Sequence, residues 1–167
     1  MRLKLDLHVH TVYSDGEGTV DEVLATAEQR GLDGIAITDH ETITGALEAR
    51  AKSKKLIVVP GGELTTDSGH LVALGIQTPL PAKLGYTEAL KEIRRLNGVA
   101  VLVHPYAGRP KTAVWKAHKP DAVETINSLY PFFTYLTRKS RILAESLNLP
   151  KLGGSDAHYA SNVGDAY

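Results

Sequence analysis

The sequence predicts an α/β fold with a largely parallel sheet. Segments typical of strands alternate with segments typical of helices along the whole chain. The 167 residues suffice for one domain with a sizeable core, and they contain no linker, internal repeat or low-complexity segment. Strands that alternate with helices form βαβ units, so the seven expected strands either close into a barrel or remain an open sheet.

The first strand is expected at residues 3–10, LKLDLHVH, where leucine and valine alternate with polar residues. This period of two places His8 and His10 on the same face, where two imidazoles can chelate one cation. Asp6 lies on that face too, and can accept a hydrogen bond from a ring N–H. The alternative is a polar, solvated strand face.

The later elements follow from the same kinds of pattern. Thr19 and Glu22 match a capping box at the start of a helix over 19–31, and Gly31 suits its C-terminal end. Gly98 is expected to end the helix predicted at 86–98. Further strands are expected at 33–40, 55–63, 70–75, 99–105, 121–127 and 151–158, with a turn at 65–69. Further helices are expected at 42–54, 86–98 and 132–148, with room for a short helix within 106–120.

Composition narrows the classes of function. The chain is 43% hydrophobic and 23% charged, as soluble globular proteins are. Its formal net charge is zero, so no global basic field favours nucleic acid, although a local basic patch stays open. It has no cysteine, so any metal must be held by nitrogen and oxygen ligands. No apolar run approaches membrane-spanning length, and the opening strand leaves no room for a signal peptide, so a cytoplasmic protein without a membrane partner is expected.

Six of the seven histidines fall at the end of an expected strand. His8 and His10 close the first strand, His40 the second, Glu63 the third, His104 the fifth, and Asp156 and His158 the seventh, while His70 opens the strand that follows the turn. In parallel α/β folds the carboxyl ends of the strands carry the active site. One convergent metal site therefore explains these residues better than six independent core histidines do.

Several motifs resemble those of the PHP (polymerase and histidinol phosphatase) family. They are DLHVHTVYSDG, TDH, GGE, GHLVALG, HP and GSDAH, in the order found in that family and across nearly the whole chain. The combination is specific, whereas HVH or TDH alone would not be. The resemblance implies a distorted seven-stranded (β/α)7 barrel, similar to a TIM barrel, in a single PHP domain over residues 1–167. Family members usually continue beyond the equivalent of SNVGDAY, so a domain truncated at its C-terminus is also expected.

The resemblance further implies two or three divalent metal ions, with zinc, manganese or iron expected and magnesium as a further option. The implied ligands are His8, His10, Glu63 and Asp156 for the first ion, Glu63, His70 and His104 for the second, and Asp15, His40 and His158 for the third. Glu63 would bridge the first two ions. Some family members have histidine where this chain has Asp15, which leaves occupancy of the third position open.

The implied activity is phosphoester hydrolysis by a hydroxide shared between two metals. The expected substrate is a phosphomonoester, or a nucleotide or short-oligonucleotide phosphodiester. Glu63 and Asp156 are the expected catalytic carboxylates. Arg109 is the candidate phosphate clamp because a guanidinium grips phosphate through two parallel hydrogen bonds, although a solvated loop arginine is about as common. The alternatives are a non-catalytic PHP-like module of a polymerase or RNA-processing complex, and a metal-dependent C–N hydrolase.

Three residues near these motifs have ordinary explanations. His118 is expected to be exposed, and Trp115 to pack against the barrel. Asn127 follows the sixth strand and is expected to form a turn, with the orientation of substrate or of a metal-bound water as the alternative.

Overall fold

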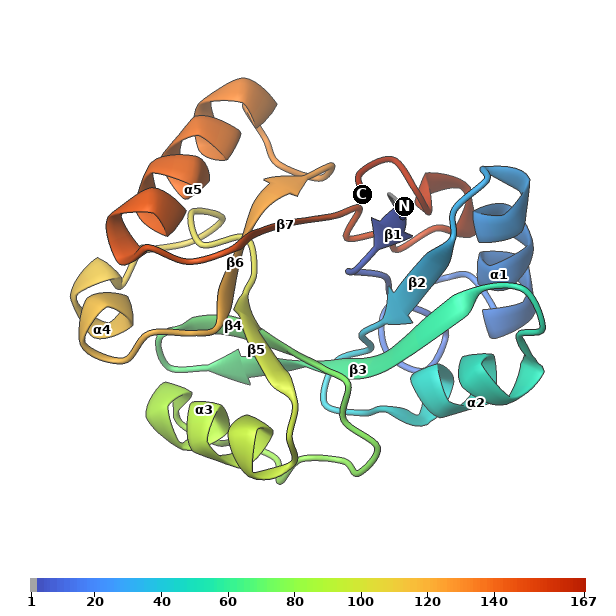
Figure 1. Ribbon diagram of the computed structural model, residues 1–167, viewed down its shortest axis with the longest axis horizontal. Coiled ribbons are helices and arrows are strands. Elements are labelled where there is room, and N and C mark those ends of the chain that lie inside the picture. The colour runs from blue at the N-terminus through green and yellow to red at the C-terminus, as the bar shows by residue number, and fades with distance from the viewer. Residues whose placement is uncertain (1–2) are drawn as a thin grey trace.

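The computed structural model describes residues 3–167, and over this range seven strands form one sheet that curls into a nearly closed barrel (Figure 1). This confirms the predicted fold class. The strands are β1 (Leu5–Asp6), β2 (Gly34–Ile37), β3 (Ile57–Thr66), β4 (Gly69–Leu74), β5 (Val99–Leu102), β6 (Ala122–Asn127) and β7 (Lys151–Gly154). The helices are α1 (Val20–Gln29), α2 (Thr44–Lys52), α3 (Tyr86–Arg95), α4 (Thr112–Ala117), α5 (Phe133–Leu147) and the short 3₁₀ helix η1 (Ala160–Asn162). Within the described residues, none of the helices combines the length and the apolar character needed to cross a membrane.

Strand β4 runs antiparallel to its neighbours, and this reversal brings one predicted metal ligand to the rim formed by the carboxyl ends of the parallel strands. It pairs antiparallel with β3 and β5, whereas the other neighbouring strands pair in parallel. A hairpin between β3 and β4 makes β4 begin where β3 ends. His70 therefore lies at the same rim as the carboxyl ends of the parallel strands. The turn expected at 65–69 is shorter than predicted, because β3 continues to Thr66 and pairs with Gly69.

The barrel closes between β1 and the segment that follows β7. Val9 pairs with Ala157 in a single parallel bridge, and the His10 N–H donates to the Ala157 carbonyl at 2.9 Å. The Asp156 N–H donates to the His8 carbonyl at 2.8 Å. We call residues 6–10 and 155–157 the seam. The strand expected at 3–10 was wrong in extent, because from residue 7 onward the chain follows this irregular pairing instead of a regular ladder.

Asp6 secures the seam from inside the fold, where its side chain is fully buried. Its carboxylate accepts hydrogen bonds from the backbone N–H groups of Ser155 at 2.8 Å, Gly164 at 2.7 Å and His8 at 3.4 Å. Burial raises the pKa of Asp6 to about 6, although these hydrogen bonds favour its charged form. The expectation that Asp6 binds a histidine ring was wrong, because backbone amides occupy its oxygens.

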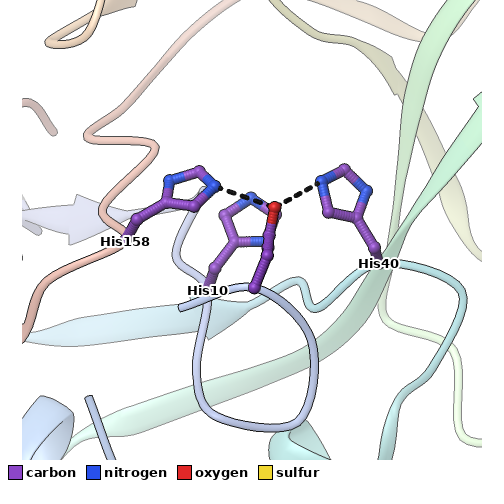
Figure 2. Close-up of side chains that lie close together, drawn as sticks. His10, His40 and His158 are labelled. Carbon is purple, nitrogen blue, oxygen red and sulfur yellow. Dashed lines mark hydrogen bonds and ion pairs between the residues drawn. The ribbon is translucent and has the colours of Figure 1, made fainter. Parts of the chain in front are cut away.

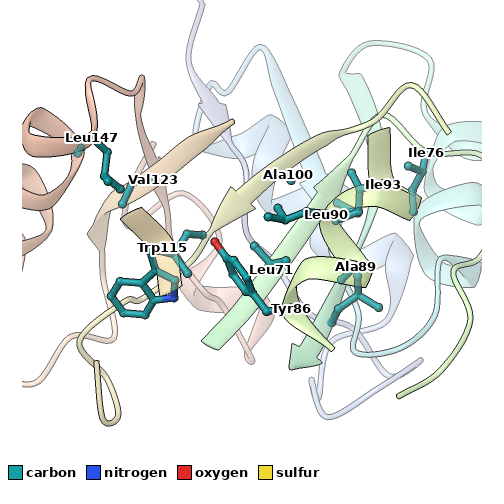
Figure 3. Close-up of a cluster of buried hydrophobic side chains, with 14 of the residues drawn as sticks. Leu71, Ile76, Tyr86, Ala89, Leu90, Ile93, Ala100, Trp115, Val123 and Leu147 are labelled. Atoms are coloured by element: carbon teal, nitrogen blue, oxygen red, sulfur yellow. The ribbon is translucent and has the colours of Figure 1, made fainter. Parts of the chain in front are cut away.

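Apolar side chains pack on both faces of the sheet. An interior cluster draws one or two residues from several strands, among them Ala36, Val72 and Val101. Outside the barrel, α1 and α2 cover β2, and a larger cluster joins α3, β4, β5 and α5 (Figure 3). Trp115 belongs to that larger cluster and is 1% exposed, as predicted. These two layers hold the strand ends in fixed positions.

The helix ends agree with the sequence in one case and differ in another. The Thr19 and Glu22 capping box is present, and Gly31 has a φ of 67°, a left-handed conformation that glycine adopts at little cost. After α3, Asn97 takes the left-handed conformation (φ 56°), one residue before the predicted Gly98. Gly98 instead permits close packing, because a Cβ there would lie 2.6 Å from Ile76 Cγ2.

We expect Asp6→Ala to lower the free energy of unfolding by about 1–3 kcal/mol, because it leaves buried N–H groups of the seam without an acceptor. Urea denaturation in the presence of a chelator measures this without any contribution from bound metal. Asp33→Ala is the matched control, since the Asp33 carboxylate accepts one backbone N–H, that of Lys4, at a more exposed position. Equal losses in the two variants would contradict a special role for Asp6.

Candidate metal centre

The structure brings all nine predicted metal ligands together at the rim formed by the carboxyl ends of the parallel strands. Four groups of their side chains have donor atoms within 4.8 Å of one another. The groups are His8, His10 and Glu63; His8, His104 and Asp156; His40, Glu63 and His70; and His10, Asp15, His40 and His158. His118 is exposed and lies in none of these groups, as expected.

Glu63 lies at the middle of this arrangement, 1% exposed. Its Oε2 is 3.0 Å from His8 Nε2 and 3.2 Å from His10 Nε2. Its Oε1 is 2.7 Å from His70 Nδ1 and 3.0 Å from His104 Nε2. Each oxygen of this carboxylate is thus nearest to its own pair of imidazoles, and Oε2 is also 3.8 Å from His40 Nε2. A carboxylate placed in this way could be shared by two cations.

A neighbouring group centres on Asp15. Its Oδ1 is 3.5 Å from His10 Nδ1, and its Oδ2 is 3.6 Å from His40 Nε2 and 3.3 Å from His158 Nε2. The His10 ring stacks against the rings of His40 and His158, with 4.8 and 4.4 Å between the ring centres, and His40 and His158 direct a nitrogen at the carboxylate from either side (Figure 2). Asp15 is the most exposed of the four residues in this group, with 53% of its side chain accessible to solvent.

His10 provides a test of whether a cation fits. Its side chain is fully buried, yet neither ring nitrogen makes a hydrogen bond within residues 3–167. Glu63 and Asp156 lie 3.2 and 3.3 Å from Nε2 without hydrogen-bond alignment. A buried polar atom without a partner is costly, and a divalent cation would satisfy it. The donor set of imidazoles and carboxylates is one that zinc, manganese and iron accept.

Hydrogen bonds fix the tautomers of two of the histidines. His8 Nδ1 donates to Glu124 Oε1 at 2.9 Å, and His158 Nδ1 donates to the Asp156 carbonyl at 2.9 Å. Because Nδ1 carries a proton in each ring, Nε2 is the atom that can offer a lone pair to a cation, once the cation displaces any proton shared with the carboxylate that Nε2 faces. Both Nε2 atoms face carboxylates of the clusters, so each ring presents its lone pair to the position a cation would take.

Sequence reasoning missed Glu124, which is 2% exposed. Besides His8, its Oε2 accepts hydrogen bonds from the His104 N–H at 2.8 Å and from Asn127 Nδ2 at 2.9 Å. Asn127 Nδ2 also contacts Asp156 Oδ2 at 3.1 Å, and its own Oδ1 accepts the Leu129 N–H, so Asn127 both forms the turn and orients a cluster carboxylate. The sequence feature that could have revealed Glu124 is its charge inside the otherwise apolar predicted strand DAVETIN.

Asp39 is a second buried residue that was not predicted, although it stands within TDH. Its oxygens accept the Thr11 N–H at 2.7 Å, the Thr11 hydroxyl at 2.8 Å and the Ser14 hydroxyl at 2.9 Å. These bonds hold the loop that carries Asp15. Gly45 allows the approach, because a Cβ there would lie 2.3 Å from Asp39 Oδ2.

Two cluster residues have left-handed backbones, with φ of 28° at His104 and 57° at Asp156. This conformation is uncommon for residues other than glycine, and strain of this kind concentrates at functional sites. At Asp156 the conformation accompanies seam hydrogen bonds on either side of the residue. The hydrogen bonds that close the barrel therefore also position the Asp156 carboxylate.

The charges at the rim depend strongly on one another. Burial works against a charge on Glu63, but His8, His10, His104 and His70 outweigh it and hold the pKa of this carboxyl well below its usual range. Burial likewise opposes a charge on His8, yet Glu124, Asp156 and Glu63 raise its pKa well above the ordinary value. The carboxylates thus create a demand for positive charge, which protons on the histidines or divalent cations can meet.

A cavity of about 380 Å³ opens beside His70 and His104. Arg109, Lys111, Thr66 and Trp115 are among the other residues that line it. The structure thus places Arg109 on a wall shared with two of the cluster histidines, and the cavity has room for a bound group larger than a single ion.

Comparison with known proteins agrees with these features. A family model described as PHP domain matches residues 6–108, and another described as PHP-associated matches residues 136–167. The phosphoribosyl 1,2-cyclic phosphate 1,2-diphosphodiesterase of Eggerthella lenta is 35% identical over an alignment of 153 positions, which includes 79% of this chain and 58% of that protein.

Two solved structures share the fold. One is a two-domain protein of Bacteroides vulgatus containing a predicted PHP-like metal-dependent phosphoesterase, with a TM-score of 0.79 and 23% identity over 95% of this chain and 52% of that chain. The other is an amidohydrolase of Chromobacterium violaceum, with a TM-score of 0.81 and 20% identity over 98% of this chain and 91% of that chain. The chain therefore spans little more than half of the diphosphodiesterase and of the two-domain protein.

We expect Glu124→Gln to weaken binding of Mn²⁺ or Zn²⁺ by about 10–100-fold, because His8 loses the carboxylate that fixes its tautomer and position. Calorimetric titration of the metal-free protein measures the affinity. Glu145→Gln changes an exposed glutamate on α5 and is the control. Wild-type affinity in Glu124→Gln would show that this carboxylate does not support the centre.

We expect Asp15→Ala to bind one divalent ion fewer than the wild type. The carboxylate is the hard ligand of its group and sits on an exposed loop, so this position should also be the weakest and should favour manganese or magnesium. Elemental analysis after equilibrium dialysis counts the ions, with the exposed Asp21→Ala as control. If Asp15→Ala and the wild type bind the same number of ions with the same affinities, Asp15 is not a ligand.

Proposed function

Since the chain belongs to the PHP family, we propose that it is a phosphoesterase whose divalent metal ions are held at the open rim of its barrel. The observation that carries this proposal is the position of Glu63, whose two oxygens face two separate pairs of imidazoles. A carboxylate in this position can hold two cations at the short separation that phosphoester hydrolysis uses. The name of the related diphosphodiesterase supports a phosphodiester substrate.

In this proposal the nine residues would hold three ions. His8, His10, Glu63 and Asp156 would hold the first, Glu63, His70 and His104 the second, and Asp15, His40 and His158 the third. When bound, such ions polarise a phosphoryl group and make water a stronger nucleophile at neutral pH. His10 is a ligand of the first set that also faces the third, because Nε2 lies toward Glu63 while Nδ1 lies toward Asp15. The third position is thus coupled to the first through one imidazole.

The protein's own residues would orient the reactants. Glu124 keeps the His8 lone pair directed at the cluster, and Asn127 holds one oxygen of Asp156 so that the other faces His8 and His10. Arg109 would bind a phosphate oxygen from the cavity wall, and its guanidinium would favour the extra negative charge of the transition state. The side chains supply positive charge and fixed orientation, while the cavity holds the remainder of the substrate.

A panel of substrates tests the activity. We expect the Mn²⁺-loaded protein to hydrolyse p-nitrophenyl phosphate, bis-p-nitrophenyl phosphate or a short oligonucleotide, to lose that activity with a chelator, and to regain it with added metal. A parallel panel of cyclic amides addresses the C–N hydrolase alternative. Hydrolysis of amides alone would overturn the proposal, and metal binding without turnover of either panel would favour a non-catalytic module.

Glu63→Gln is the sharpest variant for this proposal. It keeps the shape of the side chain but removes the charge shared by two groups of ligands, so we expect activity to fall by at least about a hundredfold. Circular dichroism should show that the fold is kept. His118→Gln changes an exposed histidine outside the site and should retain wild-type activity. Near-normal turnover by Glu63→Gln would exclude a carboxylate shared by two ions.

A further inference from the structure

Exposed aromatic side chains gather where β6 leads into α5. Phe132 is 84% exposed, Phe133 47% and Tyr135 59%. Phe132 ends the connection that follows Asn127, and Phe133 and Tyr135 lie in the first turn of α5; the amide of Asn127 contacts Asp156 of the metal centre. These rings therefore belong to the functional rim and not to the far end of the barrel. Adjoining exposed rings of this size typically mark a binding surface.

Lys139 links these rings to the cavity beside the metal centre. Its ammonium lies 4.8 Å from the centre of the Tyr106 ring and 5.2 Å from that of the Tyr135 ring. Tyr106 in turn packs edge-on against Trp115, with 6.4 Å between the ring centres, and Trp115 lines the cavity together with His104. A continuous series of rings and one cation thus runs from the cavity to α5.

The backbone at Phe132 adds an independent observation. This residue precedes α5 with a φ of 57°, a left-handed conformation that is unusual for a bulky side chain. The cost is not offset by burial of the ring, which is the most exposed large apolar side chain among residues 3–167. Such strain is characteristic of positions where a ligand makes use of the conformation.

We propose that Tyr106, Phe132, Tyr135 and Lys139 form a stacking surface for the bases of a single-stranded oligonucleotide whose phosphodiester reaches the metal centre. The inference rests on the proposed phosphoesterase function and names its substrate class. Bases stack on the exposed rings of Phe132 and Tyr135, and the ammonium of Lys139, held between two rings, meets a phosphate. Arg109 and Lys111 continue the positive charge along the cavity wall.

The mixture of rings and cations identifies the occupant. Lysine is depleted in the cores of protein–protein interfaces, whereas a strand of nucleic acid requires both aromatic faces and positive charge. A local basic and aromatic surface also fits a chain with zero net charge, because the attraction needs to act only beside the site. Stacking on a ring face accepts any base, so this surface should show little sequence preference.

Binding of a fluorescein-labelled, hydrolysis-resistant phosphorothioate hexamer to the metal-loaded protein, followed by fluorescence anisotropy, tests the proposal. A hexamer of the same backbone with abasic sites is the second probe. We expect the wild type to bind the base-containing hexamer at least about tenfold more tightly than the abasic one, given the contribution of each stacked base. The double variant Phe132→Ala/Tyr135→Ala should bind both probes with the weaker, abasic affinity.

Tyr167→Ala is the matched control, because Tyr167 is also exposed and also lies under a lysine, with Lys4 5.6 Å from its ring centre. It should bind like the wild type. Lys139→Ala should weaken binding of both probes and lower the salt dependence. Hydrolysis of p-nitrophenyl phosphate reports separately on the phosphoesterase proposal, since a wild type that hydrolyses it but binds the two probes equally would contradict only the inference about substrate.

Several outcomes would overturn the stacking surface. Equal affinity of the wild type for the two probes would show that the bases make no contact. Wild-type affinity in the double variant would place the bases elsewhere. A change of oligomeric state in the double variant, measured by light scattering and accompanied by unchanged hexamer binding, would assign the rings to contact between copies of the chain.

Discussion

Burial of the Glu63 carboxylate is the constraint on which the rest of the rim depends. A charge that is 1% exposed requires compensation from nearby groups, and four imidazoles from different parts of the chain provide it. Each imidazole must then be supported in turn, which explains the second layer formed by Glu124 and Asn127. The positions of β1, β3, β4 and β5 relative to one another are thus specified by polar contacts as well as by apolar packing.

The reversal of β4 resolves a geometric difficulty of this arrangement. A regular barrel would deliver one ligand segment from the end of each strand and would separate consecutive strands by a helix. The β3–β4 hairpin instead places His70 diagonally across from Glu63, seven residues later in the chain, without any crossover. One carboxylate can therefore be approached from two directions by residues of one hairpin and of its neighbours.

The sequence predicted the rim well because its signals are local. A few residues suffice to show which side chains alternate onto the same face of a strand and whether a histidine stands at the strand end. A shared rim for His8, His40 and His104 could therefore be predicted. Contacts that depend on register between distant segments could not be read in this way. Glu124 meets His8 across 116 positions of sequence, and no local pattern reveals that pairing.

Asp6 shows most clearly where prediction from the alternation of side chains fails. The alternation places it on the same face as His8 and His10, yet its carboxylate accepts hydrogen bonds from the amides of Ser155 and Gly164, because the chain leaves the regular strand at this point. The division of His10 between two clusters is equally unreadable, since it depends on where the Asp15 loop folds back. Residue types at the site could be predicted, whereas partnerships between its residues could not.

The seam has a consequence for the lifetime of the folded protein. His8 lies on one segment of the seam and Asp156 on the other, so an ion bound by both would hold the two segments together. Binding of such an ion would stabilise the folded state by mass action. At a free concentration about one hundred times Kd, one such ion adds about 2.7 kcal/mol to the free energy of unfolding. At low metal concentration the barrel would open more often and expose the edges of β1 and β7 to proteases. The rate at which the protein is degraded would then depend on the metal supply.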